Sequence, residues 1–260
     1  MRVGSGANPL ELSDFGGTAE RLQPLSIVPL AGKPVPTFPE ALSKRLMTWD
    51  QDPPPGARRG YHHGNLREAL MKAALELIAA KGTAGFTFAE AARAAGVSPA
   101  APYRHYRDRD SLMADVARRA FELFAAKLSQ AWAKGTPDPF KAFERVGHAY
   151  IAFARVEPAQ YSAMFESGLS FQAFPDLHVA GDRAFNVLRD ACAALIATMP
   201  EGKRPPVMMM ALHIWAEAHG IASLFARGDE ARRPIPMSPE DLLDAAVLIY
   251  LDGLGVRRAG

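Results

Sequence analysis

Cysteine is nearly absent from this sequence of 260 residues, and long apolar runs and an excess of charge of one sign are absent too. The single cysteine, Cys192, excludes an intrachain disulfide and suits a reducing compartment. We find no run apolar enough to span a membrane and no secretory leader, so we expect a cytoplasmic protein with no membrane partner. The formal net charge is only +2, so any affinity for nucleic acid must come from a local basic patch.

Motifs of the common enzyme classes are also missing. The sequence contains no nucleophile elbow, phosphate-binding loop, paired-cysteine motif or His-Glu-x-x-His zinc motif. Cys192 lies among apolar residues of a predicted helix, which indicates an inert thiol in the core. The adjacent His62 and His63 supply too few ligands for a metal site. We therefore expect no enzymatic activity, no cofactor and no metal.

The first 60 residues differ from the rest of the chain because they contain nine of the 21 prolines. Prolines at this density interrupt helices and sheets, so we expect residues 1–60 to form a mostly disordered extension. Two interpretations of its beginning stay open: a translated tail, or translation that begins at Met47. The basic stretch Arg58–Gly64 ends the extension, and it is either an arm for the DNA minor groove or an ordinary linker.

The stretch Gly85–Tyr106 predicts two short helices joined by a tight turn. Thr87 followed by Glu90 forms a capping box at the start of the first helix. Gly96 ends that helix in a left-handed conformation, and Ser98 caps the next one. Pro102 leaves open that this second helix starts late or opens with a tighter turn. This arrangement is typical of a helix-turn-helix, whose second helix lies in the DNA major groove. The Thr87 hydroxyl either caps its helix only or also binds a phosphate.

Helical periodicity dominates the remainder of the sequence, and no strand pattern competes with it. An amphipathic helix is predicted over Leu66–Lys81, and a long helix over Asp108–Ala133 spans roughly 35–40 Å. Further helices are predicted over Phe140–Ala154, Pro158–Glu166, Leu177–Met199, Val207–Phe225 and Leu242–Leu254. The sequence therefore predicts an all-α fold, with a helix-turn-helix domain over residues 61–115 and a second helical domain over residues 116–260.

Several of these residues resemble the DNA-binding domain of the TetR/AcrR transcriptional regulators. The resemblance rests on Tyr61–Arg67, Gly96–Ser98, Tyr103–Tyr106 and Arg109. The stretch Trp215–Gly220 resembles the Trp-His-Gly signature of one C-terminal ligand-binding domain in this family. The resemblance implies a three-helix DNA-binding domain, a C-terminal domain for effector binding and dimerisation, and repression as the usual mode of action.

Candidate DNA contacts cluster around the second helix of the motif. Arg104 is the strongest base-reading candidate, through two bonds to guanine, but a phosphate contact is equally open. Ala100 leaves room for close approach to a thymine methyl group. The resemblance implies phosphate contacts for Tyr103, His105 and Arg109. The full set of predicted DNA-binding residues is Thr87, Ser98, Pro99, Ala100, Tyr103, Arg104, His105 and Arg109, with Pro99 at the first position of its helix.

The last two predicted helices, Val207–Phe225 and Leu242–Leu254, are apolar on most of their faces. A single chain would leave part of this surface uncovered, so we expect the two helices to pair with their copies in a homodimer. The resemblance implies the same interface. A symmetric dimer presents two DNA readers, which matches a palindromic operator in double-stranded DNA.

Candidate pocket residues lie on the helices of the second domain. Trp215 and His219 are four residues apart and share a helix face. Gly220, next to His219, allows another backbone to come close. They are either a core tryptophan beside a hydrogen-bonded histidine, or the edge of an effector pocket. The other candidates are Phe143, Tyr150, Met164, Phe165 and Phe185. Aromatic and methionine side chains make an adaptable apolar lining, which favours a small apolar effector.

These observations together predict a sequence-specific transcriptional regulator, a repressor that a small-molecule effector releases from its operator by shifting a conformational equilibrium. The alternative is a helical ligand- or partner-binding protein whose DNA reader has decayed. The presence of Arg104, His105 and Arg109 argues against decay.

Overall fold

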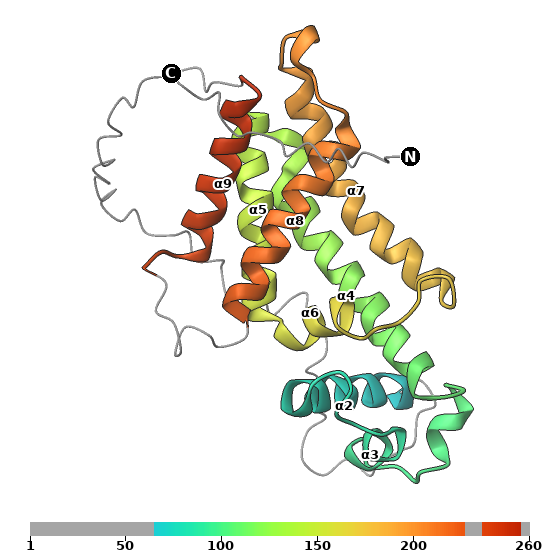
Figure 1. Ribbon diagram of the computed structural model, residues 1–260. Helices are drawn as coiled ribbons and strands as arrows, with labels where there is room; N and C mark the ends of the chain where they lie inside the picture. Colours follow the sequence, from blue (N-terminus) through green and yellow to red (C-terminus); the bar gives the residue numbers. More distant parts are fainter. Residues whose placement is uncertain (1–64, 227–235, 256–260) are drawn as a thin grey trace, which may run out of the picture. The chain divides into compact units, whose positions relative to one another are not determined.

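The computed structural model describes residues 65–226 and 236–255, in which every regular element is a helix (Figure 1). The all-α fold class predicted from the sequence is therefore confirmed for this part of the chain. The predictions for the extension 1–60, the alternative start at Met47 and the Arg58–Gly64 arm lie outside the described residues.

The first two described helices are α2 (Asn65–Lys81) and α3 (Phe88–Ala94). Thr87 caps α3 as predicted: its hydroxyl accepts a hydrogen bond from the backbone N–H of Glu90 at 3.2 Å, and the Glu90 carboxylate accepts from the backbone N–H of Thr87 at 2.8 Å. The turn after α3 uses Gly96 at a φ of 72°, a left-handed conformation that glycine adopts without strain. The first helix and the turn of the predicted motif are thus confirmed.

A 3-10 turn, η1 (Ala101–Arg104), stands where the sequence predicted a second helix capped by Ser98. The predicted cap is wrong, because Ala100 holds the cap position and makes no side-chain bond. The cause is Pro102, whose nitrogen carries no hydrogen and cannot donate to the Ser98 carbonyl one turn earlier. That carbonyl accepts from the backbone N–H of Ala101 at 3.0 Å instead, with the tighter spacing of a 3-10 turn.

The long helix α4 (Arg109–Trp132) follows, and its 24 residues extend over about 36 Å. Asp108 caps it: its carboxylate accepts from the backbone N–H of Ser111 at 2.8 Å, and the Ser111 hydroxyl oxygen accepts from the Asp108 N–H at 3.1 Å. The domain boundary that we predict between residues 115 and 116 falls inside this helix. α4 therefore belongs to both parts of the protein.

Asp115, on the second turn of α4, joins this helix to α2. Its side chain is buried, and Oδ2 accepts hydrogen bonds from Arg67 Nε and from the Tyr106 hydroxyl, both at 2.7 Å. Oδ1 accepts from Arg118 at 2.7 Å. Burial alone raises the pKa of the Asp115 carboxyl, but the hydrogen bonds from the arginines and the tyrosine outweigh burial and lower it below its ordinary value. Because a buried carboxylate needs such partners, the cluster fixes α2 against α4.

The C-terminal helices match their predicted ranges to within three residues at every end. They are α5 (Pro139–Val156), α6 (Pro158–Phe165), α7 (Pro175–Ala197), α8 (Val207–Ala226) and α9 (Pro239–Gly253), with the 3-10 turns η2 (Ala133–Gly135) and η3 (Glu201–Lys203) between them. Proline occupies the first position of α5, α6, α7 and α9, where its missing N–H costs nothing.

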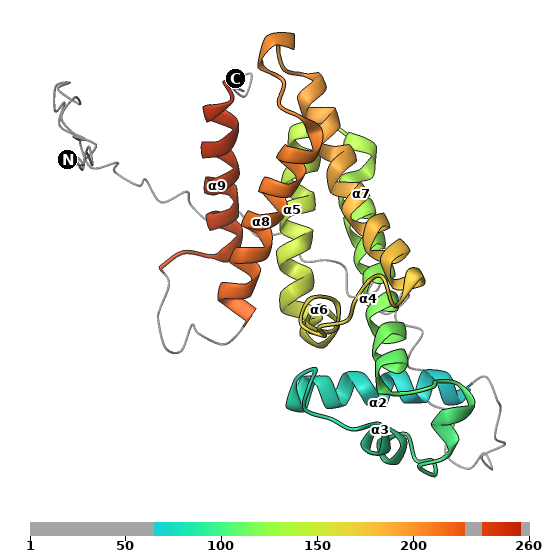
Figure 2. The same ribbon diagram turned by 45° about the vertical axis from the view of Figure 1, so that its right-hand side comes forward.

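Packing in the C-terminal part centres on α4, which contacts α5, α6 and α7. α8 contacts α5, α7 and α9, and α9 lies beside α8 and α5 at one edge of the bundle (Figures 1 and 2). The larger core cluster continues from α2 through α4 into α5, α6 and α7 without interruption. A second cluster lies between α5, α7, α8 and α9. α4 thus connects the core of the first part with that of the second.

The stretch Val207–Phe225 in α8 corrects our expectation that no run could span a membrane, since among the described residues it is long and apolar enough by length and composition. Only 33% of this stretch is buried within the chain. A helix that presents an apolar face to a protein partner can be equally long and apolar. The polar residues His213, Glu217 and His219 on α8 suit a protein contact better than a lipid one.

Replacement of Asp115 by Asn should lower the free energy of unfolding by roughly 2–3 kcal/mol, because charged hydrogen bonds are lost and buried donors lose their acceptor. Asp110→Asn is the matched control on the same helix, since its side chain is 60% exposed and pairs with Arg109 on the surface. It should change stability by about 0.5 kcal/mol or less. Urea unfolding followed by circular dichroism measures both. Equal effects would show that the Asp115 cluster does not hold α2 on α4.

Candidate functional site

Side chains predicted to contact DNA lie at the surface around the start of α3, the following turn and η1. Tyr103 and Arg104 of η1, and His105 directly after it, are exposed. The other exposed members of the set are Thr87, Ser98, Pro99 and Ala100. Pro99 lies two residues before η1, so its predicted place as the first helical residue is wrong. The roles of these residues in DNA binding stay predictions.

Tyr103 is held in place although 64% of its surface is exposed. Its ring packs edge-to-face on Phe88 of α3, with ring centroids 5.1 Å apart and an interplanar angle of 85°. The neighbouring Pro102 is fully buried. The ring contact attaches η1 to α3, and the burial of Pro102 fixes the turn in the core, so Arg104 and His105 extend from an ordered turn.

Thr87 is fully occupied as a helix cap. Its hydroxyl also donates to Glu90 Oε2 at 3.1 Å, and Lys81 Nζ donates to Glu90 Oε1 at 2.8 Å. The hydrogen bond from Lys81, followed by those from Thr87, lowers the pKa of Glu90 to about 2. Glu90 is therefore charged and occupies the positive end of α3, where a phosphate would otherwise bind. The capping role is confirmed, and the phosphate contact stays a prediction.

Arg109 has a structural role that the sequence did not reveal. Its guanidinium donates to the backbone carbonyls of Phe86, at 3.0 Å from Nε, and of Thr83, and it lies over the Phe86 ring at 4.7 Å from the centroid. These contacts brace the loop between α2 and α3. Its predicted phosphate contact remains a prediction, and any such contact would have to add to these bonds or replace them.

In the C-terminal part, His219 of α8 forms the centre of an aromatic cluster. Its Nδ1 lies 3.0 Å from the Tyr150 hydroxyl of α5 and 2.8 Å from the Tyr161 hydroxyl of α6. Its ring stacks on Tyr161 at 5.7 Å and meets Phe165 edge-on at 4.8 Å. Trp215, one turn earlier on α8, is 5.7 Å from the His219 ring. Three helices therefore meet at one imidazole.

The electrostatics of this cluster favour uncharged groups. Burial lowers the pKa of His219 and raises the pKa values of Tyr150 and Tyr161. At neutral pH the imidazole is neutral and both phenols keep their protons. The cluster therefore offers hydrogen-bonding groups without charge inside an aromatic lining, which suits a largely apolar ligand with one or two polar atoms.

The structure brings together only some of the predicted pocket residues. Tyr150, Phe165, Trp215 and His219 belong to the aromatic cluster, and Phe185 of α7 meets Trp215 edge-on at 6.4 Å. Met164 is buried in the larger core cluster, and Phe143 lies in the separate one between α5, α7, α8 and α9. The assignment of these residues to an effector pocket stays a prediction.

Tyr161 and Phe124 belong to the cluster but were not predicted. Phe124 of α4 meets Tyr150 edge-on at 5.1 Å. Both residues lie at buried helical positions, where periodicity predicts burial but not the partner on another helix.

Two further expectations about residues in this part can be compared with the structure. Burial raises the pKa of Cys192 to about 12, which agrees with an inert thiol. Gly220, expected to allow close backbone approach, has an open surface: a Cβ atom there would meet nothing within 4 Å among the described residues. Within this chain that expectation is wrong.

Two family models match the sequence. "Bacterial regulatory proteins, tetR family" matches residues 70–116, and "Tetracyclin repressor-like, C-terminal domain" matches residues 143–250. Together they cover more than half of the chain. No curated protein matches it significantly.

Solved structures share the fold. A protein of unknown function from Rhodococcus sp. RHA1 is 27% identical, with a TM-score of 0.63 over 75% of this chain and 98% of that one. The TetR family transcriptional regulator PfmR from Thermus thermophilus is 20% identical, with a TM-score of 0.54 over 71% and 96%. A TetR-family transcriptional regulator from Bordetella parapertussis 12822 is 16% identical, with a TM-score of 0.54 over 75% and 99%.

A helix-turn-helix core with an exposed basic turn, followed by a helical second domain, defines a DNA-binding transcriptional regulator rather than an enzyme. The chain belongs to the TetR family of these regulators. Members of this family bind DNA and small-molecule effectors and are dimeric.

Neutral His219 should make the stability of the protein depend on pH. The unfolded chain takes up a proton near pH 6.5, whereas the folded chain resists protonation because burial lowers the pKa of His219. Stability should therefore fall as the pH drops below about 6.5. His219→Gln should flatten this part of the profile. Urea unfolding of both proteins between about pH 5.5 and 7.5 measures the slopes; identical slopes would mean that His219 titrates as in an unfolded chain.

Proposed function

We propose that this protein is a homodimeric repressor that binds a palindromic operator and is released from it by a small, largely apolar effector. The proposal rests on the combination of two features in one chain. The braced helix-turn-helix presents an exposed basic turn, and the last helices present an apolar face that the chain itself does not cover. The first feature supplies one DNA reader, and the second supplies the means to pair two of them. We place the regulator in the cytoplasm, together with its DNA.

The apolar face lies on the last two helices, and we call it the α8–α9 face. Its exposed large apolar residues are Met208, Met209, Leu212 and Leu224 on α8, and Leu248 and Ile249 on α9. Gly220 is exposed as well. It lies between Leu212 and Leu224 on α8, and multiples of four residues separate it from both. Small residues between leucines allow two helices to approach closely. Exposed apolar residues along two helices that contact each other support pairing with a second copy.

Two connections relate the aromatic cluster to the DNA-binding part. The first is α4, where Phe124 contacts Tyr150, and Asp115 lies nine residues earlier, about 13 Å along the same helix. The second is α6, which carries Tyr161 and contacts α2. The Thr83 hydroxyl, after α2, donates to the Glu166 carbonyl at the end of α6 at 2.9 Å.

A ligand that binds at the aromatic cluster therefore contacts elements that also hold α2. If it binds better to a conformation with a different separation of the two readers, it lowers the population that fits the operator. The neutral, aromatic character of the cluster supports an effector with little charge. The alternative, a partner-binding protein with a decayed reader, has less support because Arg104 and His105 are exposed on a braced turn.

Selection of binding sites from random DNA, at two salt concentrations, tests the reader. The full-length protein should select a palindrome of two half-sites, and Arg104→Ala should lose roughly 1–3 kcal/mol of binding and relax specificity at one base pair. Arg189→Ala, an exposed arginine on α7, is the matched control and should leave selection unchanged. Equal loss on all sequences would make Arg104 a phosphate contact. Enrichment without sequence preference that vanishes at higher salt would contradict specific regulation.

Leu212→Glu should convert the dimer into a monomer, because a carboxylate would be buried in the α8–α9 face without a partner. Val179→Glu is the matched control, since Val179 is as exposed as Leu212 but lies on α7. Sedimentation velocity measures the mass of each variant, and circular dichroism checks that both remain helical. A monomeric wild-type protein, or dissociation by Val179→Glu alone, would contradict the proposed interface.

A further inference from the structure

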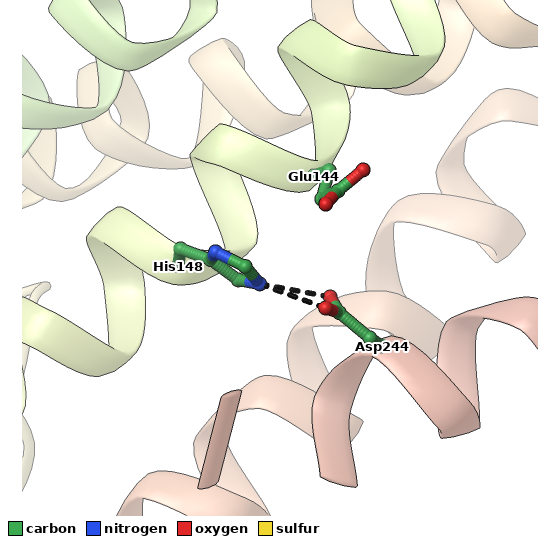
Figure 3. Close-up of side chains that lie close together, drawn as sticks. All are labelled: Glu144, His148 and Asp244. Atoms are coloured by element: carbon green, nitrogen blue, oxygen red, sulfur yellow. Dashed lines mark hydrogen bonds and ion pairs between the residues drawn. The ribbon is translucent and has the colours of Figure 1, made fainter. Parts of the chain in front are cut away.

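Three side chains with metal-binding atoms converge between α5 and α9. Glu144 and His148 lie one turn apart on the same side of α5, and both extend toward Asp244 of α9 (Figure 3). His148 Nε2 is 2.9 Å from Oδ1 and 3.0 Å from Oδ2 of Asp244. One ligand atom from each of the three residues lies within 4.8 Å of the other two.

We propose that Glu144, His148 and Asp244 form a binding site for a first-row divalent metal ion such as Zn²⁺, which fastens α9 to α5. The site is separate from the proposed DNA reader and from the aromatic cluster, and it does not depend on the proposed function.

The ligand set fits this class of ion. Zn²⁺ binds imidazole nitrogen and carboxylate oxygen at about 2.0–2.2 Å, and two ligand atoms of a tetrahedral ion lie about 3.3–3.6 Å apart. The His148–Asp244 separation of 2.9 Å is shorter than this, and the limit of 4.8 Å for the whole group is more than 1 Å longer. Binding of an ion therefore requires side-chain rotations that separate His148 from Asp244 and bring the widest pair of ligand atoms closer together. An imidazole ligand favours zinc and its neighbours over Mg²⁺ or Ca²⁺, which prefer oxygen.

The charges also balance. A dication bound by two carboxylates and a neutral imidazole gives a site with no net charge. A neighbouring ion pair between the same helices, Arg155 Nη1 to Glu240 Oε1 at 2.8 Å, already pairs its own charges. Three protein ligands leave one position of a tetrahedral ion for water or for a ligand from elsewhere.

The backbone around the site is already held close. Leu243, next to Asp244, is buried against α5 at Gly147, next to His148. A Cβ atom on Gly147 would lie 3.0 Å from Leu243 Cδ2, so the glycine permits this close approach. The two helices therefore present the three ligands without having to move together first, which reduces the cost of binding an ion.

The test uses the full-length protein, stripped of metal with a chelator, and Zn²⁺ alone as the probe. Isothermal titration should show binding that is at least about tenfold weaker in His148→Gln, Asp244→Asn and Glu144→Gln, since the loss of even an outer partner of a metal ligand costs this much. Co²⁺ in place of Zn²⁺ should give visible absorption bands in the wild type that each variant reduces. Zn²⁺ should also raise the unfolding temperature of the wild type more than that of the variants.

His178→Gln is the matched control, because His178 forms an exposed pair with Asp182 on α7 at 3.4 Å and should not affect binding. A second control replaces His62 and His63 and so removes any contribution of the adjacent histidines. Glu144→Gln keeps the His148–Asp244 contact, so it decides the question if the other two variants unfold. Absence of zinc binding by the wild type, or wild-type affinity in Glu144→Gln, would overturn the proposal. Either result leaves the DNA-binding proposal untouched.

Discussion

The buried carboxylate of Asp115 is the constraint on which the rest of the arrangement depends. A charge taken out of water is tolerated only when hydrogen bonds replace its hydration, and Asp115 receives them from Arg67, Tyr106 and Arg118. These donors come from α2, from the segment after η1 and from α4 itself. Because all three must stay in place, the DNA-binding part and the first turns of α4 behave as one body. Any movement of α4 therefore moves the reader.

This coupling gives the aromatic cluster its significance. α4 reaches the cluster through Phe124, and α6 reaches it through Tyr161 and then bonds back to the loop after α2 through the Glu166 carbonyl. The cluster thus contacts α4 and α6, and both of these helices contact α2. If α4 shifted against α6, the shift would strain either the hydrogen bonds of Asp115 or the hydrogen bond of Thr83 at the DNA-binding end. Packed interfaces of this kind favour discrete alternative arrangements over gradual deformation.

Sequence patterns predicted the helices well because their signals are local: Thr87 and Gly96 act within one turn of the chain. In the second helix of the motif the predicted Ser98 cap is wrong, whereas the late start and tighter turn that Pro102 left open are what forms. The bonds of Arg109 to carbonyls more than 20 residues earlier, and the contact of Tyr161 with His219, have no local signal. Contacts between distant helices need the fold, and this is where the site was only partly predicted.

The attachment of α9 links the two remaining features of the C-terminal part. Only Leu243 and Leu251 of this helix are buried, whereas α8 buries a residue on nearly every turn. Leu242, Val247 and Tyr250 of α9 are partly buried against the core, and Asp244 and Glu240 add polar contacts with α5. Partly exposed ion pairs stabilise little, so these polar contacts add little to the apolar ones. In the proposed dimer, burial of Leu248 and Ile249 would supply further apolar contact, and an ion at Asp244 would tie the same helix to α5. Dimerisation and the polar α5–α9 contacts should then reinforce each other, because each fixes the helix that the other needs in place.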